Sequence, residues 1–464
     1  EKEFPRLAEL PFDYKNKYHA ITNKVDGKIF LTVIGAPEEI IKLSGLSEER
    51  KKDMEDELAK MSGEGLRVLA FASKNNFDKE LKAGEIKELT FGGFFGLKDT
   101  LRPEICEAMK KAISAGIKVV MITGDHKITA EAIARDAGIF NDGNTILTGE
   151  DIDSLSEEDF ANMLDQVSVF ARVTPEHKLK IVQAYKKKGI IIALPGDGVN
   201  DAPSLVAADL GIGMGKIGTE VAKEASDIVL LDDNFASIIS AVEEGRSIYK
   251  TIKKVILYLF STSFGEAFTI IGALLLGFPL PLLAAQIVWL NFVTDGFLDV
   301  SLAMEPKEEG LLKGNFEHPK KYLLDLLSVQ RMFLMALTMM IGTLFVFSKY
   351  YQIDIVKAYT VSLTVLAVFQ WFNAWNCRSE SKSIFKLNPF SNKFLVGATL
   401  IVISLQLLVI YNPLMQGILH TTALNLSDWL LIIPIAFSII IVEEIRKLIY
   451  GQFHQSGLNT TRVS

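Results

Sequence analysis

Residues 190–205 read IIIALPGDGVNDAPSL, and this stretch decides the fold of the first half of the chain. An apolar run of strand length ends at a glycine-rich turn that carries Asp197, Asn200 and Asp201. Carboxylates at the end of a buried strand, with a phosphate nearby, are the hard oxygen ligands that Mg²⁺ requires. The alternative is a turn chosen only for its backbone geometry. Three polar residues directly behind the apolar run favour a magnesium and phosphate site.

The surrounding sequence alternates short apolar strands with amphipathic helices. Residues 93–246 contain this rhythm repeatedly, for example in KVVMITGD and VSVFARV. It predicts an α/β domain with a mainly parallel sheet, whose active site lies at the carboxyl ends of the strands. Residues 1–92 predict a partial α+β domain instead. In that domain a strand is expected at residues 28–35, helices after Pro37 and Ser47, and a strand at residues 66–74.

A second phosphate-binding motif lies earlier in the α/β region. ITGDHKITA follows a predicted strand and opens a helix, which places Thr123, Gly124 and Asp125 at the strand end. A helix N-terminus favours an anion, and a hydroxyl with backbone N–H groups can hold phosphate oxygens. Lys178, in TPEHKLKIV, can neutralise phosphate charge. The alternatives are an ordinary helix-capping turn and a solvated lysine.

The second half of the chain is apolar enough to cross a membrane. From residue 247 to 464 it contains six runs of about 20 mostly apolar residues, the length that spans a bilayer. Their approximate bounds are 254–277, 283–303, 327–348, 358–377, 394–412 and 428–443. Lysine and arginine are concentrated in the loops at residues 305–321 and 378–393. Because such loops face the cytoplasm, we expect the head, which is the part of the chain before the first span, and the C-terminus to lie there as well.

Composition excludes several other classes of protein. The chain has 464 residues, 49% of them hydrophobic, and a formal net charge of −7. A chain of this kind gives no reason to expect nucleic acid as a partner. Two cysteines do not support a disulfide framework or a cysteine-rich zinc site. No obligatory protein partner is evident. The first residues contain no initiator methionine and no targeting segment, so we interpret the sequence as a fragment.

Polar residues at membrane depth indicate an ion site. Ser263 and Glu266 share one face of the first predicted span. In the second span, WLNFVTDGFLD places Asn291, Thr294, Asp295 and Asp299 on one helical face. Carboxylates with amide and hydroxyl oxygens suit a hard cation such as Ca²⁺. Hydrogen bonding between helices is the alternative, adequate for Ser263 but poor for Glu266 and Asp295.

The motifs TGD, TPEHK and GDGVNDAP together resemble the phosphorylation domain of the P-type cation-transporting ATPases, which has a haloacid-dehalogenase-like fold. The resemblance covers essentially the whole chain. It implies a multidomain α/β protein with an α-helical membrane part. The implied domains are a partial nucleotide-binding domain (1–92), the phosphorylation domain (93–246) and a six-helix transmembrane bundle (247–464). Six spans resemble the calcium, sodium–potassium and proton pumps more than the heavy-metal pumps.

The resemblance also implies roles for single residues. For the nucleotide, it implies contacts by Phe12 on adenine, by Lys17, by Arg67 on phosphate, and by the hinge residues Asp99 and Arg102. For phosphate chemistry it implies Thr123, Gly124, Asp125, Lys178, Asp197, Asn200 and Asp201, with Asp197 holding Mg²⁺. Ile34 stands where the family has a lysine, and Pro195 where it usually has threonine. The phosphorylated aspartate of DKTGT and the TGES loop are expected upstream of this sequence.

In the membrane part, NFVTDG is similar to NLVTDG of the calcium pumps. Ser263 stands where that branch commonly has asparagine. Gln370 stands where the sarcoplasmic-reticulum pump has a glutamate. The plasma-membrane calcium pumps resemble this chain at that glutamine. Asp299 is an additional carboxylate, and we hypothesise that it replaces the charge lost at Gln370. It could instead serve proton countertransport.

We therefore predict an ion pump that uses ATP and Mg²⁺ and moves Ca²⁺ out of the cytoplasm, across the plasma membrane. Alternatives are a Na⁺, Mn²⁺ or H⁺ pump of the same family, or a non-catalytic nucleotide-binding membrane fragment. A membrane-tethered phosphatase fails to explain Glu266, Asp295 and Asp299. The transported cation and the lipid bilayer are the expected partners.

Overall fold

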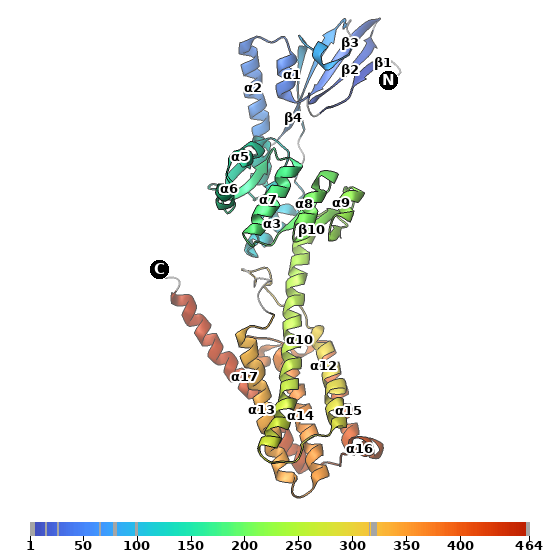
Figure 1. The fold of residues 1–464 in the computed structure, drawn as a ribbon, viewed down its shortest axis with the longest axis vertical. Coiled ribbons are helices and arrows are strands. Elements are labelled where there is room, and N and C mark those ends of the chain that lie inside the picture. The colour runs from blue at the N-terminus through green and yellow to red at the C-terminus, as the bar shows by residue number, and fades with distance from the viewer. Residues whose placement is uncertain are drawn as a thin grey trace. The chain divides into compact units, whose positions relative to one another are not determined.

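The computed structural model describes residues 5–13, 16–25, 27–64, 66–77, 81–97, 101–314, 316 and 323–460. The chain divides into two compact units. The first unit comprises Glu1–Ala241 with Leu312–Asn315, and the second comprises Val242–Leu311 with Phe316–Ser464. Helix α10 (Phe235–Leu275) begins in the first unit and continues in the second (Figure 1). Each unit is described by itself below.

The first unit begins with a five-stranded antiparallel sheet in the order β1-β2-β3-β4-β5. Its strands are Arg6–Leu10, Tyr18–Val25, Lys28–Gly35, Arg67–Asn75 and Thr90–Leu97. The alternation predicted in β3 is present, because Leu31 and Val33 are fully buried between less buried neighbours. Helices α1 (Pro37–Leu43) and α2 (Glu48–Gly63) follow β3, and Ser47 caps α2. A short 3₁₀ helix, η1, covers Ala83–Glu85.

The rest of the first unit contains two three-stranded parallel sheets, in the orders β6-β8-β7 and β11-β10-β9. In chain order their strands are β6 (Met121–Ile122), β7 (Thr145–Thr148), β8 (Val167–Ala171), β9 (Ala193–Gly196), β10 (Leu210–Met214) and β11 (Ile228–Leu230). Helix α3 (Ile105–Ser114) precedes β6. The helices between the strands are α4 (Lys127–Asp136), α5 (Gly149–Ser154), α6 (Glu157–Met163), α7 (Pro175–Lys187), η2 (Val199–Asp201), α8 (Ala202–Ala207) and α9 (Glu220–Glu224). This is the predicted strand–helix alternation.

Strands β6 and β9 each form an edge of their sheet. The apolar run before β9 is open at that edge, because Ile190 and Ile191 are 40% and 44% exposed. Apolar strands of parallel sheets are normally covered on both faces and paired. Both edge strands also end at a predicted motif, β6 at Thr123 and β9 at Asp197.

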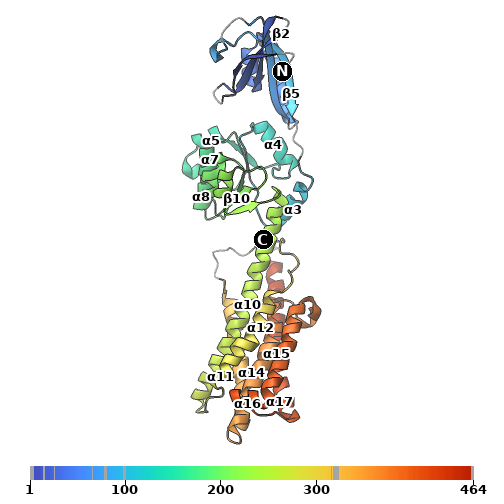
Figure 2. The same cartoon turned by 90° about the vertical axis from the view of Figure 1, so that its right-hand side faces the viewer.

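The second unit is helical (Figure 2). Its elements after α10 are α11 (Ala284–Trp289), η3 (Leu290–Asp295), α12 (Gly296–Ala303), α13 (Leu326–Tyr350), α14 (Ile355–Cys377), η4 (Ile384–Lys386), η5 (Pro389–Ser391), α15 (Lys393–Tyr411), α16 (Pro413–Leu419) and α17 (Leu426–Thr460). Helix α14 is central, since 72% of its most apolar stretch is buried, against 33–44% in the other long helices. Its polar residues therefore face protein on several sides.

Among the described residues, five helices are long and apolar enough to cross a membrane, where the sequence predicted six spans. The predicted span at 283–303 is helical but divided into α11, η3 and α12. Segment η3 is a π-helix, with wider hydrogen-bonded turns, and such segments often mark functional sites. None of the three pieces is long enough to cross a membrane alone, which explains the difference in count.

Candidate functional site: two polar clusters

The TGD turn is fixed by strand β8. The backbone N–H of Thr123 donates to the carbonyl of Phe170 (2.9 Å), and that of Arg172 donates to the carbonyl of Asp125 (3.0 Å). The Thr123 hydroxyl donates to Asp125 Oδ2 (3.2 Å) and accepts from the backbone N–H of Asp125 (3.1 Å). Helix α4 starts two residues after Asp125. The turn therefore presents a hydroxyl, a carboxylate and a helix N-terminus together.

The GDGVND turn is organised around Asp201. Lys178, on α7, donates to Asp201 Oδ1 (2.5 Å). The backbone N–H groups of Asp197 (3.3 Å) and Gly198 (3.2 Å) donate to Asp201 Oδ2. Burial raises the pKa of the Asp201 carboxyl, but the Lys178 ammonium and these N–H groups outweigh it and hold that pKa below its usual range. A side chain at Gly196 would meet Asp201 Cβ at 2.8 Å, so this position needs glycine.

Asp197 differs from Asp201 because its carboxylate is exposed and has no hydrogen bond or ion pair within the described part of the chain. The donor set fits a divalent metal, since Asp197 and the nearby Asn200 amide offer oxygen atoms that protein groups do not occupy. Asp201 is already satisfied and shapes the turn. In the ranges that the structure describes, no hydrogen bond joins this turn to the TGD turn.

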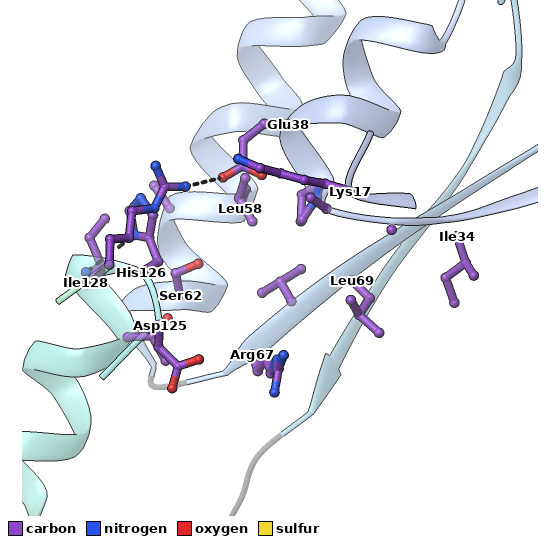
Figure 3. Close-up of a pocket in the computed structure, with 18 of the residues that line it drawn as sticks. Lys17, Ile34, Glu38, Leu58, Ser62, Arg67, Leu69, Asp125, His126 and Ile128 are labelled. Atoms are coloured by element: carbon purple, nitrogen blue, oxygen red, sulfur yellow. Dashed lines mark hydrogen bonds and ion pairs between the residues drawn. The ribbon is translucent and has the colours of Figure 1, made fainter. Parts of the chain in front are cut away.

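A pocket of about 700 Å³ lies in the first unit, between the antiparallel sheet and the TGD turn (Figure 3). Phe12, Lys17 and Arg67 line it, as do Gly124 and Asp125. The sequence assigned these two groups separately, to a nucleotide and to a phosphate. Most of the remaining lining is apolar, including Ile34, Leu58 and Leu69. An apolar pocket with a few cationic side chains fits a nucleotide base and its phosphates.

The sequence analysis missed Arg172 and Glu38, which line this pocket. Arg172 lies 3.5 Å from Glu38, on α1, in an ion pair across the pocket. Arg172 has a positive φ of 51°, a conformation that a non-glycine residue keeps only where its surroundings hold it. Burial and the positive charge of Arg172 lower the pKa of His126, against a smaller opposite effect of Glu38. The only signal for Arg172 is its position in FARVTPEHK, just before Lys178.

Arg102, one of the two hinge residues, does not line the pocket. Arg102 Nη1 donates to the carbonyl of Asp233 (2.7 Å) instead. Asp99 lies outside the described residues.

In the second unit, Glu266 joins three helical segments. Its Oε2 accepts from Asn291 Nδ2 on η3 (2.8 Å), and its Oε1 accepts from Gln370 Nε2 on α14 (2.9 Å). Glu266 is 5% exposed and Gln370 is fully buried. The second amide atom of Gln370, Oε1, is buried without a hydrogen bond. The structure thus brings together three residues that the sequence placed in the ion site.

Asp295 forms the next layer. Tyr258 donates to its Oδ1 (2.6 Å) and Thr262 donates to its Oδ2 (3.1 Å). Asp295 is 2% exposed. The sequence analysis named neither hydroxyl donor, although Tyr258, Thr262 and Glu266 are spaced four residues apart on α10 and so share a face.

The other predicted ion-site residues have different positions. Asp299 is half-buried, and its Oδ1 accepts the N–H of Val300 (2.6 Å). Thr294 is buried. Ser263 is exposed on α10, whereas Ser261, two residues earlier, accepts a hydrogen bond from Asn373 (2.7 Å). Glu266 and Asp295 therefore form the centre of the cluster.

Two family models match the chain. "P-type ATPase, cytoplasmic domain N" matches residues 1–104, and "Cation transporting ATPase, C-terminus" matches residues 279–449. A calcium-transporting ATPase of Bacillus subtilis is 40% identical over 455 residues, 93% of this chain and 50% of the relative. Calcium-transporting ATPase 1 of Saccharomyces cerevisiae is 38% identical over 96% of this chain and 49% of the relative. Human calcium-transporting ATPase type 2C member 1 is 35% identical over 96% of this chain.

The matched relatives cover 93–96% of this chain and therefore extend over both units. The chain belongs to the P-type cation-transporting ATPases, and it is an integral membrane protein. It spans about half the length of the curated relatives that it matches.

Proposed function

We propose that this chain is the later part of an ATP-driven calcium pump that works through an aspartyl-phosphate intermediate. The observation that carries the proposal is the arrangement around Glu266 and Asp295. Both carboxylates are buried in an apolar helical unit, and among the described residues they accept hydrogen bonds only from amides and hydroxyls. Inserting an aspartate at the centre of a membrane helix costs roughly 3 kcal/mol of free energy. We therefore expect this pair of carboxylates to bind a group that offsets the cost.

A bound cation would offset this cost. In this structure the Asn291 and Gln370 amides direct their N–H₂ groups to Glu266. When a cation binds, the same amides can turn their oxygen atoms towards it, and the unpartnered Oε1 of Gln370 supports such a rotation. The proposed ligands are the side chains of Glu266, Asn291, Asp295 and Gln370, with Thr294 and Asp299 beside them. Ser263 contributes less, because it is exposed on α10.

In the first unit, the 700 Å³ pocket is the proposed ATP site. Phe12 would stack on the adenine, and Lys17 and Arg67 would approach the phosphates. Asp99 and Arg102 would act at the hinge. Other family members have a lysine at the position of Ile34. In this chain Lys17 and Arg67 would supply the positive charge of the site.

Phosphoryl transfer needs an aspartate that this sequence does not contain. We place its strand between β6 and β9, because among the described residues each is an edge strand of its sheet and is followed by one of the two phosphate motifs. That strand would also cover Ile190 and Ile191, which are exposed in this chain. Relatives with about twice the length of this chain have residues to supply it.

The phosphate motifs would then act on this aspartate from both sides. Thr123, Gly124 and Asp125 would hold the transferred phosphoryl oxygens, and Lys178 would balance their charge while it fixes Asp201. Asp197, with Asn200 beside it, would hold Mg²⁺. When bound, Mg²⁺ neutralises charge on the phosphoryl oxygens.

The proposed orientation follows the positive-inside rule, with the head and the C-terminus in the cytoplasm and the protein in the plasma membrane. Ca²⁺ is the proposed cargo, because relatives at 35–40% identity are named as calcium-transporting ATPases. Gln370, an amide beside Glu266, is the feature that would favour Na⁺, Mn²⁺ or H⁺ instead.

The test is phosphoenzyme formation from labelled ATP by the full-length protein in purified membranes. Ca²⁺ is titrated against a chelator, with Na⁺ and Mn²⁺ as comparisons. We expect acid-stable phosphoenzyme at micromolar Ca²⁺. Labelling that ignores Ca²⁺ and follows another ion would keep the family and replace the cargo. No labelling with any ion would contradict the enzyme itself.

A further inference from the structure

Asp233 connects two segments of the first unit that the proposed mechanism leaves unexplained. Its carboxylate accepts four hydrogen bonds from three consecutive backbone N–H groups. Gly215 donates to Oδ1 (2.7 Å), Lys216 donates to both oxygens (3.1 and 3.2 Å), and Ile217 donates to Oδ2 (2.9 Å). Asp233 is 8% exposed and has a positive φ of 52°. A buried carboxylate in this conformation is held for a reason that local turn geometry does not supply.

The loop at residues 215–219 is fixed at its other end as well. The backbone N–H of Thr219 donates to the carbonyl of Asp197 (2.9 Å). A side chain at Gly215 would meet the Leu230 carbonyl oxygen at 2.8 Å. The loop therefore lies between Asp233 and the residue proposed to hold Mg²⁺, and its backbone has little room to deform.

Asp233 is also tied to the start of α10. Its carbonyl accepts from Arg102 Nη1 (2.7 Å). The next residue, Asn234, accepts from the N–H of Ala236 in the first turn of α10 (2.9 Å) and donates to Glu104 (2.8 Å). Helix α10 continues without interruption to Glu266 (Figure 1).

A carboxylate suits this position better than an amide. Both oxygens of Asp233 accept hydrogen bonds, whereas an asparagine would turn an N–H₂ group towards one of the same donors. Burial raises the pKa of the Asp233 carboxyl, and the three N–H groups outweigh it, so the carboxyl remains ionised at neutral pH. Hydrogen bonds to an ionised acceptor are stronger than neutral ones.

We propose that Asp233 is a positioning residue that links the Asp197 turn to the first turn of α10, and so links phosphorylation to the helix that carries Glu266. This inference rests on the proposed function and adds the path through Gly215, Thr219 and Asn234. A displacement of the Asp197 turn moves the loop at 215–219, and the Asp233 carboxylate passes that movement to the cap of α10.

The test compares Asp233→Asn with wild type in the full-length protein. The rate of phosphoenzyme formation and the cation concentration that half-saturates it are expected to stay within about threefold of wild type. Phosphoenzyme decay and ATP turnover are expected to slow about tenfold or more, because the step after phosphorylation loses its link. Asp233→Glu keeps the charge and is expected to recover part of the decay rate.

Asp227→Asn is the matched control. Asp227 also accepts a backbone N–H, from Gly211 on β10 (2.7 Å), but it has no bond to the Asp197 turn or to α10 in the described part of the chain. Its decay rate is expected to equal that of wild type.

Two results would overturn the link. Decay at the wild-type rate in Asp233→Asn would show that the link carries nothing. Phosphorylation that falls as much as turnover would make Asp233 a simple support of the catalytic turn. If Asp233→Asn does not fold, Asn234→Ala, which breaks the same path at the cap, decides by the same two rates. Absence of phosphoenzyme in the wild type would instead contradict the proposed function.

Discussion

Asp201 in the first unit and Glu266 in the second are both buried carboxylates, 7% and 5% exposed, but their partners differ. Asp201 accepts from a lysine and two backbone N–H groups. Glu266 accepts from two side-chain amides, and no lysine or arginine pairs with it among the described residues. A carboxylate with its own cation is complete. One with only neutral partners can take a cation from outside, which is what a transport site must do.

The same contrast separates residues within the first unit. Asp197 is exposed and unpaired in the described ranges, so it can take a metal, whereas Asp201 serves the turn. The predictions below test whether partner type distinguishes ligands from supports. They run from the largest expected effect to the smallest.

The largest effect is expected for Asp197→Asn in the full-length protein. Loss of the proposed Mg²⁺ ligand should slow phosphoenzyme formation by roughly 100-fold or more. Labelled ATP in a quenched-flow experiment measures the rate. Asp209→Asn is the control, since Asp209 bonds to the N–H of Ile192 (3.0 Å) away from the turn. A wild-type rate in Asp197→Asn would remove Asp197 from the site.

Glu266→Gln should raise the Ca²⁺ concentration that half-saturates phosphorylation by about 100-fold, because the central charge of the proposed site is lost. The measurement is phosphoenzyme level against free Ca²⁺. Thr343→Ala is the control, a fully buried hydroxyl of α13 without a hydrogen bond. Unchanged Ca²⁺ dependence in Glu266→Gln would refute the site.

Asp299→Asn should raise the Ca²⁺ concentration that half-saturates phosphorylation by only about tenfold. The reason is that this carboxylate is half-buried and lies beside the centre of the proposed site. Asp299→Glu keeps the charge and should recover most of the loss. An effect as large as that of Glu266→Gln would make Asp299 a full ligand, and no effect would sink the hypothesis that it replaces the charge absent at Gln370.

Lys178→Met removes the cation that pairs with the buried Asp201 carboxylate. At pH 7 it should lower the free energy of unfolding of the first unit by about 1–3 kcal/mol, because Asp201 loses its cation. The pKa of Asp201 is lowered in the folded state, so this stability is present above its unfolded pKa and is lost as pH falls through the folded value. The difference between variant and wild type should therefore shrink below about pH 4.

Urea unfolding of the full chain in detergent measures that difference. Lys187→Met is the control, because the Lys187–Glu157 pair is exposed and should contribute nothing measurable. An equal loss of stability in the two variants would mean that burial does not distinguish these ion pairs.

Much of the fold could be predicted from residue patterns. The strand at Lys28–Gly35 was predicted from alternation, the helix at Pro37 from its proline, and the helix after Ser47 from its amphipathic, charge-rich pattern. All three are confirmed. Strands β1 and β2 were not foreseen. Their sequences mix polar and apolar residues, and their strand conformation comes from pairing, of β2 with β3 and of β1 with β2.

In the membrane part, residue patterns predict less of the structure. Hydropathy gives the length of an apolar run, but not the hydrogen-bond register that turns residues 290–295 into a π-helix. The sequence placed Glu266, Asn291 and Gln370 in one site, and the structure brings them into contact. Tyr258 and Thr262 were missed because their role depends on which face of α10 meets Asp295.

The most direct test of the account is Ca²⁺ uptake into sealed vesicles that contain the full-length protein, with ATP outside. The account predicts ATP-driven uptake in the wild type and none in either Asp197→Asn or Glu266→Gln, since one cycle needs both clusters. Uptake that persists without Asp197, or ATP hydrolysis that ignores Ca²⁺ in the wild type, would contradict it.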